Sequence, residues 1–254
     1  LQAAHIGIAM GGRGTDVARE AASLVLLDDD FASVVRALRL GRRIYDNLRK
    51  AMAYILAIHL PIAGLALMPL VLGWPLLLTP MLIAMMELVI DPTCSIVFEA
   101  EQSETDLMRR PPRRQGGAVL PPALIGWSLV QGGLGLMATA GAVIWATRAG
   151  CDASQVRLVG WLALMAVNLA LVTTNRRHDG RASLQLVRGQ AVVWWGMGLS
   201  IGLLVLTTAV APVRTFLAMS PPSPSMWIVP PFMAALLALV LQMLKPIWAR
   251  ALRS

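Results

Sequence analysis

Residues 85–94 read Met85-Met86-Glu87-Leu88-Val89-Ile90-Asp91-Pro92-Thr93-Cys94, and they place two carboxylates inside an apolar segment. The segment from Pro75 to Phe98 is long and apolar enough to cross a bilayer, and Glu87 lies near its centre. An ionised carboxylate at that depth costs about 2.5–3.5 kcal/mol or more, so carboxylates within spans usually mark an ion path. We therefore expect a transmembrane helix whose function needs these two groups.

The spacing of the two carboxylates favours a cation site. Glu87 and Asp91 are four residues apart, so on a helix they share one face, one turn apart. Pro92 has no backbone N–H, which leaves the carbonyl of Leu88 without its helical partner. The alternative is that Pro92 only kinks the helix and that both carboxyls are protonated and hydrogen-bonded to neighbouring helices.

The preceding apolar segment, residues 51–72, has a similar arrangement. It contains one ionisable residue, His59, and Pro61 deprives the carbonyl of Ala57 of its helical partner. Interrupted helices with polar groups at the midplane are a common way to build a cation site in transporters. We expect helix breaks at Pro61 and Pro92 and a cation or metal site that uses Glu87, Asp91 and His59 with the carbonyls of Leu88 and Ala57.

Composition supports a membrane protein. The 254 residues are 57% hydrophobic and 14% charged, and the mean hydropathy is +0.66. The 22 basic and 14 acidic residues give a net charge of +8, which could suggest nucleic acid. The arginines cluster in short loops between apolar segments, however, so positive-inside topology explains them better and no nucleic-acid partner is expected.

Residues 1–50 differ in kind from the rest. They read as a strand, a glycine-rich turn, a helix begun by Thr15, and a second strand closed by the acidic residues 28–30. This order predicts the last part of an incomplete α/β domain, because fifty residues cannot bury such a core alone. The turn could bind phosphate and the acidic cluster a metal, but a tight turn and a favourable helix start are the simpler interpretations.

The remainder predicts a helical bundle. Apolar residues recur at helical spacing from Phe31 onward, which predicts one long helix running into the first span and broken near Pro61. We expect the incomplete α/β segment to cover residues 1–40, followed by a helical stalk at 41–50 and a membrane domain at 51–254, with residues 1–50 and the C-terminus cytoplasmic. The expected six spans are residues 51–72, 76–98, 120–147, 156–174, 191–213 and 226–244.

Two polar side chains within the later spans are possible accessory groups. Gln131 and Asn168 could reach the cation site, although interhelical hydrogen bonding is the more common use of such residues.

Several motifs in order resemble those of the type II P-type cation-transporting ATPases, the family of the calcium and sodium/potassium pumps. The matching stretches are Ile6-Gly7-Ile8-Ala9-Met10-Gly11, Gly14-Thr15-Asp16-Val17-Ala18, Leu27-Asp28-Asp29-Asp30-Phe31, Gly41-Arg42-Arg43-Ile44-Tyr45-Asp46-Asn47 and Met108-Arg109-Arg110-Pro111-Pro112-Arg113. The resemblance covers residues 1–114, and the expected spans fit the family's fifth to tenth transmembrane helices.

The resemblance implies a chain that begins within the phosphorylation domain. The phosphorylation site, the nucleotide-binding and actuator domains and the first four membrane helices would then be missing partners. ATP and Mg²⁺ would act in the complete pump, and this chain is not expected to hydrolyse ATP alone. The lipid bilayer and the transported cation are the other expected partners.

The resemblance also carries the family's ion-site positions onto His59, Ile62, Glu87, Ile90 and Asp91. The pattern is similar to that of calcium pumps at Asp91, where the residue is the same, but it differs at the other four positions. The identity of the transported ion is therefore left open among Ca²⁺, Mn²⁺, Mg²⁺, H⁺ and Na⁺. His59 suits proton coupling or a transition metal, or else it hydrogen-bonds a carbonyl released by Pro61.

Cys94 stands alone, without the Cys-Pro-Cys of heavy-metal pumps, and is interpreted as a small buried hydrophobe rather than a soft-metal ligand. It is also a possible accessory polar group, together with Asn168 and Gln131.

The alternative function is an ATP-independent channel or membrane scaffold subunit with six spans. It accommodates polar groups at the midplane but explains neither the α/β segment nor the motifs. Short loops and an Ala/Leu/Arg-rich composition suggest a bacterial plasma membrane.

Overall fold

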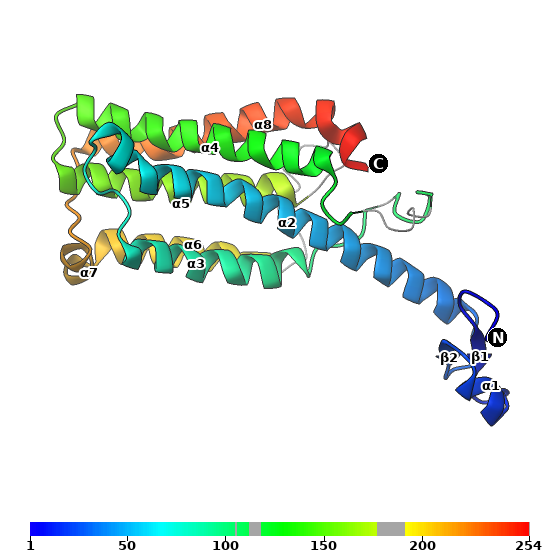
Figure 1. Ribbon diagram of the computed structural model, residues 1–254. Helices are drawn as coiled ribbons and strands as arrows, with labels where there is room; N and C mark the ends of the chain where they lie inside the picture. The colour runs from blue at the N-terminus through cyan, green and yellow to red at the C-terminus, as the bar shows by residue number, and fades with distance from the viewer. Residues whose placement is uncertain (105, 112–117, 177–190, 254) are drawn as a thin grey trace. The chain divides into compact units, whose positions relative to one another are not determined.

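The structure, a computed structural model, describes residues 1–104, 106–111, 118–176 and 191–253 and is mainly helical (Figure 1). It divides into two compact units. The first comprises Leu1–Asp46 with Ser103–Pro112, and the second comprises Asn47–Gln102 with Arg113–Ser254.

The first unit contains a small parallel sheet. Strand β1, Ile8–Met10, pairs with strand β2, Leu24–Leu26, and the short helix α1, Asp16–Glu20, connects them. Thr15 caps α1, because its hydroxyl accepts a hydrogen bond from the backbone N–H of Ala18. The expected order of strand, turn, helix and strand is confirmed. That it is part of a larger α/β domain stays a prediction.

The acidic residues after β2 bind backbone and side-chain groups of this unit. The carboxylate of Asp29 accepts hydrogen bonds from the backbone N–H groups of Gly12 (2.8 Å) and Arg13 (3.0 Å). The carboxylate of Asp30 accepts one from the N–H of Ala32 (2.9 Å), where helix α2 begins. The glycine-rich turn therefore already has a carboxylate on the N–H groups that a phosphate would use.

A basic residue ties residues 104–110 to the first part of α2. Arg110 forms ion pairs with Asp46 (2.7 Å), Asp106 (2.8 Å) and Glu104. The hydrogen bond from Arg110 holds the pKa of the Asp106 carboxyl below its ordinary value. Arg42 donates to the carbonyls of Leu107 and Arg110 (3.0 and 2.9 Å). The last residues of the basic motif lie outside the described residues.

Helix α2, Ala32–Leu72, confirms the long helix but corrects the break expected near Pro61. It stays helical through Pro61 and Pro69. The carbonyl of Ala57, which Pro61 cannot bond, lies against helix α4, Pro122–Arg148. A Cβ placed on Gly132 of α4 would come within 2.6 Å of that oxygen. Close contact with a glycine Cα–H compensates in part for the missing hydrogen bond, so the helix continues past the proline.

The helix that carries the two carboxylates changes type at its proline. Helix α3, Pro80–Pro92, is capped by the hydroxyl of Thr79 and continues as a π-helix, η1, Thr93–Phe98. The remaining elements are α5 Ala153–Asn175, α6 Ala191–Ala209, α7 Ala211–Phe216, the 3₁₀ helix η2 Pro224–Ile228, and α8 Val229–Arg253.

Among the described residues, five helical stretches are long and apolar enough to cross a membrane. They are Ala32–Leu72, Pro80–Phe98, Pro122–Arg148, Ala153–Asn175 and Pro224–Trp248. The sixth expected span, residues 191–213, corresponds to α6, which ends at Ala209 and whose stretch Trp194–Ala209 is shorter than the others. Six spans therefore stay a prediction.

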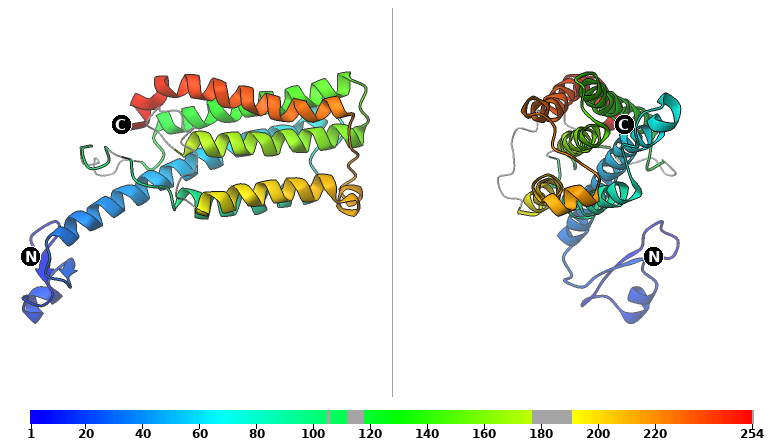
Figure 2. Two further views of the ribbon diagram at one scale, coloured as in Figure 1. Left: turned by 180° about the vertical axis from the view of Figure 1, so that it is seen from behind. Right: turned by 90° about the vertical axis from the view of Figure 1, so that its left-hand side faces the viewer.

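Within the second unit, helices α4, α5 and α8 pack side by side, and α6 lies along α3 and η1 (Figures 1 and 2). α5 is the most enclosed of these helices, with apolar side chains such as Trp161 and Leu171 fully buried. The core of the unit therefore runs along α5.

Candidate functional site

His59 of α2 and Glu87 of α3 face each other. The imidazole Nε2 lies 3.7 Å from the carboxylate Oε1, and 49% and 39% of the two side chains are exposed. The other ring nitrogen, Nδ1, lies 2.8 Å from the carbonyl oxygen of Ile55. A carbonyl only accepts hydrogen bonds, so Nδ1 carries a proton in this contact and Nε2 is the atom turned toward the carboxylate. The structure thus brings together two of the expected site residues from two adjacent helices.

Asp91 is exposed and follows Glu87 by one turn of α3. Beside it, the carbonyl of Leu88 receives no hydrogen bond from Pro92, which has no N–H. The next N–H, that of Thr93, bonds with the carbonyls of Val89 and Ile90 instead. The hydroxyl of Thr93 also donates to the carbonyl of Val89 (2.7 Å). A role of the Leu88 carbonyl in holding a cation stays a prediction.

The expected contribution of Ala57 fits this geometry less well. Its carbonyl oxygen lies against Gly132 of α4, whereas His59, two residues on, faces α3. The imidazole also bonds the carbonyl of Ile55 rather than that of Ala57. A role of the Ala57 carbonyl in holding a cation stays a prediction.

Within the ranges that the structure describes, no group of three or more His, Cys, Asp and Glu side chains is placed to hold a metal ion. Hard cations take carbonyl and water oxygens as well as carboxylates. Glu87 and Asp91 would therefore need such ligands, or groups from another part of a larger protein, to complete a coordination shell.

Asn168 of α5 is hydrogen-bonded to α2. The hydroxyl of Tyr54 donates to its Oδ1 at 2.6 Å, and both side chains are fully buried. The ring of Tyr54 also packs against that of Phe98, the last residue of η1, with 5.4 Å between the ring centroids. In the described part of the chain the Nδ2 of Asn168 has no hydrogen-bond partner. Asn168 thus joins two helices, as most buried amides within membranes do.

Gln131 makes an interhelical contact of the same kind. Its amide and that of Asn175, at the end of α5, exchange two hydrogen bonds of 3.2 and 2.6 Å. Cys94 is half-buried, carries a free thiol and packs against the apolar core; its role stays a prediction.

The sequence interpretation missed a buried ion pair beside these amides. Arg176 donates from Nε to Oε2 of Glu101 at 2.8 Å, and only 10% and 9% of the two side chains are exposed. In the sequence, Arg176 is one of the arginines between apolar segments, which positive-inside topology explains without any partner. The available signal was a polar run, Thr174-Asn175-Arg176, at the end of an apolar helix.

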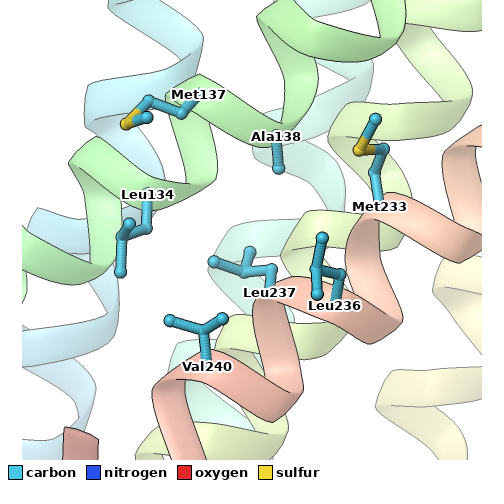
Figure 3. A pocket seen from close by; sticks show the side chains of 7 residues that line it. All are labelled: Leu134, Met137, Ala138, Met233, Leu236, Leu237 and Val240. Atoms are coloured by element: carbon cyan, nitrogen blue, oxygen red, sulfur yellow. The ribbon is translucent and has the colours of Figure 1, made fainter.

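The second unit also contains a pocket lined by apolar side chains (Figure 3). Figure 3 shows apolar side chains of α4 and α8 around it: Leu134, Met137, Ala138, Met233, Leu236, Leu237 and Val240. Such a lining offers nothing to a cation, so the charged groups on α2 and α3 are the better candidates for function.

The family of the chain follows from a direct comparison. The family model for the C-terminus of cation-transporting ATPases matches residues 75–247, which include both carboxylates and five of the helices of the second unit. The chain belongs to the P-type cation-transporting ATPases and corresponds to their C-terminal part.

Individual relatives agree with this assignment. A calcium-transporting ATPase of Bacillus subtilis is 41% identical over 133 residues, which is 52% of this chain and 15% of the relative. A calcium-transporting ATPase of Lactococcus lactis is 37% identical over 134 residues, or 53% and 15%. The sodium/potassium-transporting ATPase subunit alpha of Hydra vulgaris is 41% identical over 143 residues, or 56% and 14%. The chain therefore spans only about one seventh of the length of these curated relatives.

Proposed function

We propose that this chain is the membrane half of an ATP-driven cation pump and supplies the mid-membrane cation site with its coupling helix. The observation that carries the proposal is the approach of His59 on α2 to Glu87 on α3. The family assignment supports it, since the relatives named above are calcium-transporting and sodium/potassium-transporting ATPases.

The chemistry of the site favours a cation. Glu87 and Asp91 supply carboxylate oxygens on one helix face, and the carbonyl of Leu88, the residue after Glu87, receives no hydrogen bond from Pro92. Charged groups within a membrane span are costly, so two carboxylates on one face are best explained by a transported ion that offsets their charge. His59 would hold a proton or a metal through Nε2.

The exposure of the site supports a larger assembly. His59, Glu87 and Asp91 are partly or largely exposed in this chain, although they lie on helices apolar enough to cross a membrane. Exposed charges are expensive against lipid. We infer that the open side is covered in the complete pump by membrane helices that precede this chain. The same preceding part would bind ATP and Mg²⁺ and carry out hydrolysis.

The proposal includes the membrane in which the protein resides and its orientation there. A bacterial plasma membrane, with residues 1–50 and the C-terminus on the cytoplasmic side, fits the basic loops. The long helix α2 would then transmit movements of the ATP-hydrolysing domains to His59.

The test is Asp91→Asn in the complete pump, reconstituted in liposomes and supplied with ATP and Mg²⁺. Ca²⁺, Mn²⁺ and Na⁺ are titrated separately, and pH is varied, to find the ion that stimulates ATP hydrolysis. Asp91→Asn keeps the side-chain volume and should abolish the stimulation. Asp152→Asn, an equal change at the start of α5, is the control and should leave it intact.

Transport by Asp91→Asn at the wild-type rate would refute the proposal. Ion flux through the wild-type protein without ATP would favour a channel.

A further inference from the structure

The last turn of α5 binds three other elements through three consecutive residues. Thr174 accepts a hydrogen bond at its carbonyl from Nζ of Lys245 on α8 (2.7 Å). Asn175 is paired with an amide of α4. Arg176 pairs with Glu101, in the segment that follows η1. This end of α5 is therefore where α4, α8 and the continuation of α3 are joined.

The ion pair between Glu101 and Arg176 is buried. Relative exposure is 7% for the glutamate and 8% for the arginine as whole residues. A buried ion pair is weak as a source of stability, because apolar residues of similar volume often serve equally well, but losing one partner leaves an uncompensated charge. Such a pair therefore specifies one arrangement of the segments it joins.

A second contact holds the same segment from α2. Asn47 is buried, and its Nδ2 donates to the backbone carbonyls of Glu101 (2.8 Å) and Glu99 (3.3 Å). Residues 99–101 are thus bonded by α2 through Asn47 and by α5 through Arg176. Both contacts lie within the second unit.

The clamped segment is continuous with the helix of the site. It follows η1 directly, and η1 follows Pro92 of α3, one residue after Asp91. Helix α6 also packs closely on η1, since a Cβ on Gly196 would lie 2.5 Å from a methyl carbon of Val97. Because residues 99–101 are held in place, the helix formed by α3 and η1 has a fixed position along its axis and a fixed rotation about it.

We propose that Arg176 is a positioning residue for the cation site. It clamps residues 99–101 together with Asn47, and it thereby sets the depth and orientation at which Glu87 and Asp91 are presented. Arg176 touches neither carboxylate and acts through Glu101. This inference rests on the proposed function, because it assigns a role toward the same site.

The direction in which cation affinity changes when Arg176 is replaced distinguishes a positioning role from a direct electrostatic effect on the site. Arg176 is a cation, so if it acted on the site only through its field, removing it would tighten cation binding. Positioning predicts weaker binding, because the carboxylates lose their fixed arrangement. Mutations that act through intervening contacts typically change coupling between sites by a factor of about 2–30.

The first experiment compares the wild-type pump with Arg176→Gln, Arg176→Lys and Asp152→Ala in the reconstituted ATPase assay. Arg176→Gln should raise the half-saturating concentration of the stimulating cation about tenfold. Arg176→Lys, which keeps the charge, should restore most of the affinity. Asp152→Ala, which removes the cap at the other end of α5, should lower the melting temperature without changing half-saturation. Should Arg176→Gln fail to fold, Glu101→Asp withdraws the carboxylate by one methylene and should act in the same direction.

A half-saturating concentration that is unchanged or lower in Arg176→Gln would overturn the proposal. Absence of cation-stimulated hydrolysis in the wild-type pump would instead refute the proposed function, and a second readout then decides on the clamp alone.

That readout is the distance between spin labels at Glu99→Cys and Ile125→Cys, measured by pulsed electron paramagnetic resonance in a background of Cys94→Ala and Cys151→Ala. Both labelled positions are exposed. The proposal expects one narrow distribution in the pump with Arg176 and a clearly broader one with Arg176→Gln. Equal widths would overturn it.

Discussion

Replacing Gly132 by alanine should push α2 and α4 apart. An alanine Cβ at this position would lie 2.6 Å from the carbonyl oxygen of Ala57 and 2.8 Å from the Cβ of Leu60. Neither atom can rotate out of the way, since one is backbone and the other is fixed by the backbone. Overpacking of this kind costs about 1–3 kcal/mol. Alanine recovers up to about 1 kcal/mol through its better helix propensity, so we expect a net loss of about 1–2 kcal/mol in the free energy of unfolding.

The neighbouring glycine provides a matched control. A Cβ on Gly133 would meet no atom within 4 Å. Gly133→Ala should therefore stabilise the protein by about 0.5–1 kcal/mol, because it reduces the conformational freedom of the unfolded chain. The two variants add the same methyl group one residue apart on the same helix, and they should change stability in opposite directions.

The assay is unfolding by increasing SDS in mixed detergent micelles, followed by the fluorescence of the 8 tryptophans. Loss of stability in Gly132→Ala with a gain in Gly133→Ala is the expected result. Equal shifts in the two variants, or a gain in Gly132→Ala, would refute the close approach of α4 to the carbonyl of Ala57.

Two further outcomes concern buried and capping hydrogen bonds. Tyr54→Phe removes the donor to the buried Oδ1 of Asn168 and should lower the free energy of unfolding by about 1–3 kcal/mol in the same SDS assay. Adding Asn168→Leu should recover part of this loss, whereas additive losses would contradict a hydrogen bond between the two side chains. Asp152 caps α5, and hydrogen bonds from Ser154 and Gln155 hold its pKa below the ordinary value. The stabilisation by the Asp152 carboxylate should be complete above the unfolded pKa of about 3.9 and should be lost as pH falls through the lower folded pKa. The difference in melting temperature between wild type and Asp152→Ala should therefore disappear in strong acid. A difference independent of pH would argue against stabilisation by the ionised cap.

Local chemistry made much of the fold predictable from the sequence. Thr15 and the residues around it specify a helix start, and the two flanking apolar runs form the expected strands, which the structure pairs in parallel. Apolar length identified the long membrane helices, because burial in lipid needs little more than length and composition. The start of the long α2 was likewise visible as helical periodicity from Phe31, although a break was expected near Pro61.

The break expected at Pro61 failed because a proline acts differently according to what packs on it. The rule that proline interrupts a helix treats the helix as isolated. Here Gly132, seventy-one positions along the sequence from Pro61, lies against the released carbonyl. No local pattern in residues 51–72 contains that information.

The candidate site was only partly accessible for the same reason. The i, i+4 spacing of Glu87 and Asp91 is a local property, and it suggested both residues directly. The approach of His59 to Glu87 depends on how α2 and α3 pack. The pairing of Glu101 with Arg176 joins residues 75 positions apart, and the sequence offered only the polarity of each residue separately.

The π-helix after Pro92 has a geometric consequence for the carboxylates. A π-turn holds one more residue than an α-turn, and one residue corresponds to about 100° of rotation in an α-helix. Conversion of η1, Thr93–Phe98, into regular α-helix with its far end held would turn the preceding helix about its own axis by roughly that angle. Glu87 and Asp91 would then move together around the axis of α3 and face a different side, without any unfolding of the helix that carries them.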